Sequence, residues 1–349
     1  MYVREIQPPR ATPIENGTPV QGTWTSAFDE VNLLDIQKPY RFPLPRMVLD
    51  SRIKEWESIF IQDDSFILVA LLCNYKIYRH ASVILYDKVK MQRLRFSKTL
   101  PGTGWRLPRS LKNAFVDSRS WGFYFRIHSW LDAENIKLDL DIEPNRKRPS
   151  FTAHAELILE KEKTIPMAVS LVLNENRSMY AYKTMGPVAG DLVFGGQHIS
   201  LDPARATGIF CDFKGYYPFP MHPQWCSAFG IDSSDRRIGF AIADNQNREP
   251  YKNNENALWI DGRLTPLPPV KITSGTGPEA EWIIQDMEGM VDLVFTPKEP
   301  IRYKINQLLP VSFYEIPLGI YNGVVVDSEG EEIPVRNLSG IGEKLFLRI

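Results

Sequence analysis

Apolar and polar residues alternate along most of the chain, in short runs that are separated by turn residues. Runs of this kind, rich in β-branched and aromatic side chains, occupy residues 65–75, 80–86, 90–96, 121–130, 136–142, 151–160 and 167–174. A period of two is typical of antiparallel strands. Apolar residues near helical spacing occur around residues 49–60, where a short helix or the start of a strand would fit. The pattern therefore predicts an all-β fold, a barrel or a sandwich, with few short helices.

The second half of the chain repeats features of the first half. The tetrapeptide Pro-Val-Gln-Gly at residues 19–22 recurs as Pro-Val-Ala-Gly at residues 187–190, and each copy precedes an alternating segment that ends in Leu-Asp. Repeats of one unit build one architecture twice. We therefore expect two similar antiparallel barrels in tandem, residues 1–184 and 185–349, with the candidate site loops in the second.

Composition and charge exclude several classes of protein. The chain has 349 residues, of which 43% are hydrophobic and 24% charged, and a net charge of −1. This balance is that of a soluble globular protein. Charges of both signs are mixed along the chain, so there is no electrostatic footprint for nucleic acid or for an anionic membrane.

The cysteines and the apolar runs bear on the cellular compartment. Cys73, Cys211 and Cys226 are an odd number and lack metal-ligand spacing, so we interpret them as reduced thiols. The sequence starts without the apolar run of a signal peptide, and the longest apolar run, residues 66–73, is too short to cross a bilayer as a helix. We expect a cytoplasmic protein without a transmembrane segment.

Candidate acid–base residues fall in a stretch rich in Gly and Pro, residues 186–262. Asp212 and Glu255 could serve as acid or base, and His222 could carry protons near neutral pH. Each has a structural alternative. Asp212 could cap a turn or pair with Lys214, Glu255 could lie in a polar hairpin loop, and His222 could be an exposed loop residue.

The same stretch offers residues that could line and orient a ligand. Aromatic rings could wall an apolar pocket, amides could orient a hydroxyl, carbonyl or water, and a lysine could be buried beside a carboxylate; these residues are Tyr216, Tyr217, Trp225, Trp259, Asn245, Asn256 and Lys183. The alternative for the aromatic residues is ordinary core, and for Lys183 a solvated surface position. In an antiparallel barrel the ends of alternate strands return to one rim, so we expect Asp212 and the loop from Asn245 to Asn256 to face one cavity.

Several chemistries lack their motifs. No Gly-rich phosphate loop opens a helix, no Gly-x-Ser-x-Gly elbow has fitting partners, and no two histidines have ligand spacing. We therefore expect neither a metal nor a cofactor.

A family resemblance extends from about residue 22 to residue 343. The sequence resembles domain-of-unknown-function family 2804 in its motifs Gly-Thr-Trp at 22–24, Asn-Leu-Leu-Asp at 32–35, Trp-Gly-Phe-Tyr at 121–124, Glu-Asn-Ala-Leu-Trp at 255–259 and Val-Asp-Leu at 291–293. That family looks like a fold relative of tandem lipocalin-like proteins, which include carotenoid hydratases, tocopherol cyclase and certain pericyclases. The resemblance implies two lipocalin-like β-barrels and carries no established activity.

Three functions remain open at this point. The first is a cofactor-independent enzyme that acts on a hydrophobic small molecule (isoprenoid, lipid or polyketide-like) by acid–base catalysis, as a hydratase or lyase, a cyclase or an isomerase. The second is a non-catalytic carrier of a hydrophobic ligand. The third is a structural or partner-binding protein. The sequence does not determine the oligomeric state.

Overall fold

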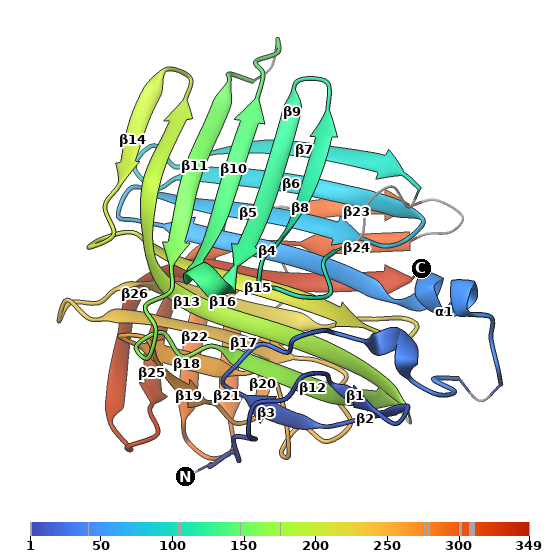
Figure 1. Cartoon of the computed structure of the whole chain (residues 1–349). Coiled ribbons are helices and arrows are strands. Elements are labelled where there is room, and N and C mark those ends of the chain that lie inside the picture. The colour runs from blue at the N-terminus through green and yellow to red at the C-terminus, as the bar shows by residue number, and fades with distance from the viewer. Residues whose placement is uncertain are drawn as a thin grey trace.

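The chain folds almost entirely into strands (Figure 1). The computed structural model describes residues 2–40, 42–102, 107–146, 148–174, 176–275, 277, 280–299, 302–306 and 311–348. Among these residues the only α-helix is α1 (Arg46–Arg52), and two 3-10 turns lie at Leu33–Asp35 and Leu131–Ala133. The all-β prediction is confirmed. The segment with helical spacing becomes α1 and then a strand.

The first sheet takes its strands from residues 22–215. Its order is β7-β6-β5-β4-β15-β13-β11-β10-β9-β8, all antiparallel, with β12 and β14 also paired to β13, and β3 paired to β12. The strands are β3 (Gly22–Trp24), β4 (Lys54–Gln62), β5 (Phe66–Asn74), β6 (Tyr78–Asp87), β7 (Gln92–Pro101), β8 (Ala114–Ser120), β9 (Phe123–Trp130), β10 (Asn135–Ile142), β11 (Phe151–Ile158), β12 (Met167–Asn174), β13 (Arg177–Phe194), β14 (Gln197–Leu201) and β15 (Thr207–Gly215). A separate hairpin joins β1 (Ile14–Glu15) and β2 (Thr18–Pro19).

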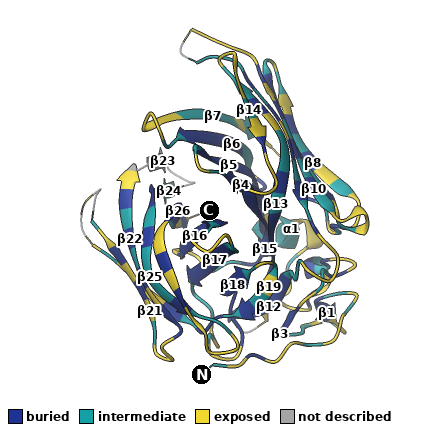
Figure 2. Ribbon diagram, turned by 90° about the vertical axis from the view of Figure 1, so that its left-hand side faces the viewer, coloured by how far each residue is buried: buried dark blue, intermediate teal, exposed yellow. Residues whose placement is uncertain are grey.

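The second sheet begins at residue 224. Its order is β19-β18-β17-β16-β26-β25-β22-β21-β20, and β24 pairs with β23 and β26. The strands are β16 (Gln224–Ile231), β17 (Arg237–Asp244), β18 (Ala257–Ile260), β19 (Arg263–Pro266), β20 (Val270–Ser274), β21 (Trp282–Asp286), β22 (Val291–Glu299), β23 (Arg302–Asn306), β24 (Val311–Glu315), β25 (Leu318–Val326) and β26 (Glu332–Arg348). Both sheets curl, so the prediction of two antiparallel barrels in tandem is confirmed as two curled half-barrel sheets (Figure 2).

Three apolar cores hold the sheets together. The first lies inside the first sheet, where β8–β11 stand across β5–β7 in Figure 1, and includes Phe66, Phe125 and Phe151. The second lies between the two sheets and includes Trp56 and Trp225. The third lies inside the second sheet.

The burial of each strand follows from its place among these cores. Every residue of β4 and β5 is buried, because one face of each strand meets the first core and the other face meets the core between the sheets. Strands covered on both sides show continuous apolar sequence, as β5 does. By contrast β9 alternates between buried and partly exposed residues, because its outer face meets water.

The structure places the division between the sheets later than the sequence suggested. Strand β13 runs through residues 184 and 185, and β15 inserts between β4 and β13, so the first sheet extends to Gly215. The two Pro-Val-x-Gly segments also differ in setting. Residues 19–22 connect β2 to β3, whereas residues 187–190 lie inside β13. The tetrapeptides therefore do not mark equivalent positions of two units.

Candidate functional site

A cavity lies in the middle core, between the two sheets. Its walls come from β4, β5, β13 and β15 of the first sheet and from β16, β17, β24 and β26 of the second. The space between the lining side chains is about 580 Å³ including its opening. We refer to this cavity between the two sheets as the slot.

Aromatic rings form much of the slot. Trp56 stacks on Phe213, with ring centroids 5.2 Å apart, and on Tyr217 at 5.0 Å. Trp225 meets Trp56 edge to face at 6.1 Å. Such ring clusters are rigid and present flat apolar surface. The indole nitrogen of Trp225 is buried and has no hydrogen-bond partner among the described residues.

One carboxyl group in the slot titrates near neutral pH. Glu343 on β26 is half-buried, lines the cavity and accepts a short hydrogen bond from the Tyr314 hydroxyl of β24. Burial raises the pKa of Glu343 to about 7, against the lowering effects of the Tyr314 hydrogen bond and the Lys183 charge. A carboxyl group with this pKa can give or take a proton at neutral pH.

A buried ion pair borders the slot. Lys183 lines the cavity from β13, and its ammonium lies 2.9 Å from Glu255 Oε2 and donates to the Glu255 carbonyl oxygen at 2.8 Å. The side chains of Lys183 and Glu255 are 2% and 1% exposed, so water hardly screens the pair. Asn245 Nδ2 donates to Glu255 Oε1 at 2.5 Å. These contacts fix the ammonium at the cavity wall.

The structure brings together five of the residues chosen from the sequence. Lys183, Glu255 and Asn245 form the ion-pair cluster, and Trp225 and Tyr217 belong to the aromatic wall. Tyr217, Trp225, Asn245 and Glu255 also border a small recess beside the main slot. For Lys183 the solvated alternative is excluded.

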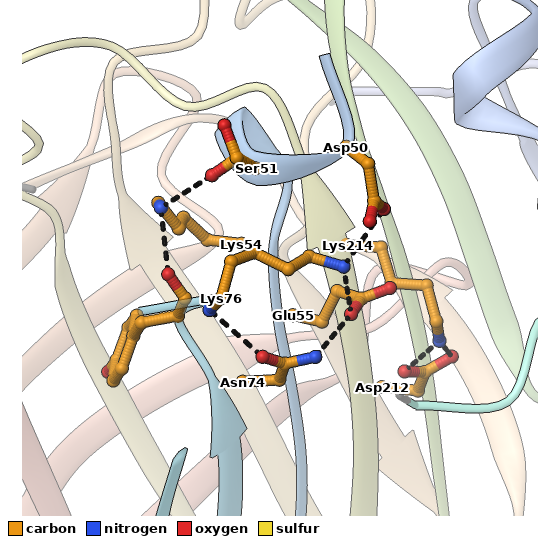
Figure 3. A network of polar contacts seen from close by, with 9 residues as sticks. Asp50, Ser51, Lys54, Glu55, Asn74, Lys76, Asp212 and Lys214 are labelled. Carbon is orange, nitrogen blue, oxygen red and sulfur yellow. Dashed lines mark hydrogen bonds and ion pairs between the residues drawn. The ribbon is translucent and has the colours of Figure 1, made fainter. Parts of the chain in front are cut away.

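Asp212 lies on the other side of β15. Its neighbours Cys211 and Phe213 line the slot, so strand alternation turns Asp212 towards the first core. There both carboxylate oxygens accept short hydrogen bonds from the Lys214 ammonium (Figure 3). Burial raises the pKa of Asp212 to about 6, opposed by Lys214. The expectation that Asp212 and Glu255 face one cavity was wrong. Consecutive residues of a strand point to opposite faces of the sheet, and Asp212 lies on the face of β15 that is turned away from the slot.

Figure 3 shows the polar network around Asp212. Lys76 bonds Glu55 at 2.8 Å and Asp50 at 3.2 Å, and Asn74 donates to Glu55 at 3.1 Å. Nearby Glu57 is fully buried, and neither of its oxygens has a hydrogen-bond partner among the described residues. Burial, followed by the Asp212 charge, raises the pKa of Glu57 well above its usual range.

The other chosen residues hold structure away from the slot. Asn256 bonds the backbone of Ala243 and Pro268, and Trp259 donates to the Ile165 carbonyl. Tyr216 is fully buried beside Tyr40 on the first-core side. The His222 side chain is exposed.

Sequence reasoning missed Glu343, Tyr314 and Trp56. A signal for Glu343 was present, because it shares the inward phase of β26 with the buried Ile341 and Leu345. A charged residue in the buried phase of an alternating strand is unusual.

The described residues show neither a metal site nor a membrane helix. No group of three or more His, Cys, Asp or Glu side chains among them could hold a metal ion. None of the helices described is long and apolar enough to cross a membrane.

The fold and the site define an all-β protein with an aromatic-walled slot, lined by one carboxyl group, between two curled sheets. The chain belongs to the family described as "Domain of unknown function (DUF2804)", whose model matches residues 4–348. No curated protein matches the sequence.

Three solved structures are similar to the chain. Kievitone hydratase from Nectria haematococca has 14% identity and a TM-score of 0.49, over 84% of this chain and 88% of that one. CghA with Sch210972, and CghA alone, each have 11% identity and a TM-score of 0.49, over 85% of this chain and 88% of theirs. The proposal below rests on the geometry of the slot alone.

Proposed function

We propose that this protein is an enzyme that acts on a hydrophobic small molecule in the slot between the sheets, by acid–base catalysis without a cofactor. The observation that carries the proposal is Glu343, a carboxyl group with a pKa of about 7 in an aromatic cavity. An acid or base works best when its pKa lies near the working pH. Titratable groups perturbed by burial inside a cleft are typical of active sites.

The surroundings of Glu343 suit proton transfer to or from an apolar molecule. Trp56, Phe213 and Trp225 would hold the substrate and keep water away, which strengthens electrostatic effects on the reacting atoms. Tyr314 would hold the carboxyl group in one orientation. The reaction class is hydration, cyclisation or isomerisation of an isoprenoid, lipid or polyketide-like compound, because each of these needs a proton moved at carbon.

The proposal is tested with a flat aromatic proton-transfer probe, 5-nitro-1,2-benzisoxazole. A base removes the proton at C3, its electron pair completes the nitrile, and the N–O bond breaks to give 2-cyano-4-nitrophenolate, which is followed by absorbance. We expect the rate to rise with pH through about 7, as Glu343 becomes ionised. Glu343→Gln should lower the rate about a hundredfold or more.

Glu57→Gln is the matched control, since it replaces a buried carboxyl group that does not line the slot by an amide of the same size. It should leave the rate unchanged. Probe binding, followed by quenching of tryptophan emission, is measured for every variant. If the probe binds but Glu343→Gln turns over as fast as the wild type, the protein is a carrier. If the probe does not bind, the partner-binding alternative stands.

A further inference from the structure

The Lys183 ammonium has N–H donors left over. An ammonium group carries three donors; one is donated to the Glu255 carbonyl oxygen at 2.8 Å, and the contact with Glu255 Oε2 at 2.9 Å is an ion pair in which that oxygen accepts no hydrogen bond. No other acceptor for Lys183 lies among the described residues; instead its nitrogen lies 5.4 Å from the centroid of the Phe213 ring, in the wall of the slot. A buried donor without an acceptor is costly, so an acceptor on a ligand would be held strongly there.

The Lys183 ammonium and the Glu343 carboxyl group come from opposite sheets but line the same slot. Lys183 is on β13 and Glu343 on β26, and both line the slot. Lys183 forms its ion pair with Glu255, which leaves the Glu343 carboxyl group to its Tyr314 partner and to the cavity. Phe213 and Trp225, whose ring centroids are 6.4 Å apart, stand beside them. A molecule in the slot can therefore meet a cationic donor and a proton-transferring carboxyl group at once.

We infer that the substrate is a flat, conjugated carbonyl compound, whose carbonyl oxygen accepts the free Lys183 N–H while Glu343 moves a proton on the carbon skeleton. This inference rests on the proposed function and narrows it, since a hydrocarbon has no oxygen for Lys183 and a saturated chain has no conjugated carbonyl group. The aromatic rings that line the slot favour a flat, conjugated molecule, because such a molecule can stack on them.

The step that this pair supports is enolisation. The Glu343 carboxylate takes a proton from a saturated carbon next to the carbonyl, or from a saturated carbon attached to the far end of a double bond conjugated with it. The C–H electron pair forms the new C=C bond of the enolate, and the negative charge moves to the oxygen, where the Lys183 ammonium stabilises it. Return of the proton from Glu343 to another carbon completes an isomerisation with no other reactant.

The experiment uses two rigid probes of nearly the same shape, 9-fluorenone and fluorene, which differ in one carbonyl group. Equilibrium dialysis measures both affinities, and infrared spectroscopy follows the C=O stretch of bound fluorenone. We expect the wild type to bind fluorenone about tenfold or more tightly than fluorene, because a hydrogen bond to a charged donor is worth that much. The C=O stretch should move to lower frequency on binding.

The double variant is chosen so that removing the Lys183 ammonium leaves no buried charge alone. Glu255→Gln keeps the Lys183 ammonium, and the double variant Lys183→Met/Glu255→Gln removes it together with its partner. The preference for fluorenone and the infrared shift should persist in Glu255→Gln and disappear in the double variant, while fluorene binds all three proteins equally.

The possible outcomes distinguish failure of the carbonyl inference from failure of the proposed function. If both probes bind equally and the double variant shows an unchanged C=O frequency, the carbonyl inference is overturned and the slot remains a binding site. If neither probe binds to the wild type, the carbonyl inference is overturned. The benzisoxazole reaction then decides separately whether the proposed function stands.

Discussion

Two carboxyl groups, the half-buried Glu343 and the fully buried Glu57, show how position decides chemical role. Both pKa values are raised by burial. Glu343 faces a slot and has a tyrosine partner, so it can exchange protons with a ligand. Glu57 faces the first core, beside the Asp212–Lys214 pair, with no acceptor or donor of its own among the described residues. The first is suited to catalysis, and the second affects stability.

Tyr314→Phe should shift the pH–rate profile of the benzisoxazole reaction to higher pH. The Tyr314 hydrogen bond lowers the pKa of Glu343, so its loss should raise that pKa above about 7. A hydrogen bond to a charged group is worth about 1.5–3 kcal/mol, which corresponds to a shift of about one unit or more. Tyr75→Phe is the control, because Tyr75 lines the same slot but its hydroxyl is paired with Cys73. An unshifted profile in Tyr314→Phe would show that this tyrosine does not tune Glu343.

Glu57→Gln should change how stability depends on pH. The pKa of Glu57 in the folded protein lies above its ordinary value of 4.5, so the folded state binds its proton more tightly than the unfolded state. Wild-type stability from this group is therefore present in full below pH 4.5 and is lost as the pH rises towards the raised pKa. The variant has no proton to lose there. Urea unfolding should show that the free energy of unfolding decreases less between pH 5 and pH 9 in Glu57→Gln than in the wild type.

Glu55→Gln provides the contrast on the same face of β4. Glu55 is ion-paired with Lys76 and bonded to Asn74, so its neutralisation leaves a buried cation with a weaker partner. This variant should be less stable than the wild type at both pH values. Equal pH dependence in Glu57→Gln and the wild type would show that Glu57 is not the titrating group.

At the scale of the element, β13 joins the two structural environments of the first sheet. Near its start it pairs with β12 and β15 and places Lys183 in the slot, and near its end it pairs with β11 and β14. Gly190 lies in the second part with φ of +132°, and a Cβ there would stand 2.0 Å from the His154 carbonyl oxygen. The strand therefore needs a glycine at this point.

Gly190→Ala should destabilise the protein by about 2 kcal/mol or more, through backbone strain and the collision with β11. Gly196→Ala is the matched control, because Gly196 also has a positive φ, +83°, but a Cβ there meets nothing within 4 Å. Its cost should be about 1 kcal/mol. Urea unfolding measures the free energy of unfolding of both variants. If both lose the same amount, the backbone near His154 accommodates the added Cβ without a loss of stability.

The positions of the strands could be predicted from the sequence better than the pairing between strands. Alternation in residues 121–130 and 136–142 marked strands that the structure confirms as β9 and β10. The fully buried run in β5 also indicated a strand, although not that both of its faces would meet a core. The insertion of β15 between β4 and β13 could not be predicted, because pairing between distant segments leaves no local pattern. Glu343 was missed for a different reason, since its signal was a single charged residue in the buried phase of β26.

At the scale of the whole molecule, the core between the sheets makes them one cooperative unit. Trp56, Phe60 and Leu71 of the first sheet share this core with Trp225 and Leu345 of the second. Large apolar interfaces couple the stabilities of the parts that they join. We expect urea unfolding to give one transition, with tryptophan emission and far-ultraviolet circular dichroism coinciding. Two separated transitions would show that each sheet is stable alone.

The lining of the slot runs along the sequence from Trp56 to Leu345, and this separation sets the order of events during folding. Contacts between segments so far apart close late, since the entropy cost of loop closure grows with the length of the loop. Until they close, the apolar faces of both sheets are open to water and to other chains, as in the exposed intermediates that aggregate. The slot is thus expected to be the last part of each new molecule to form. The surfaces that line it are the ones that most need protection while the chain is being made.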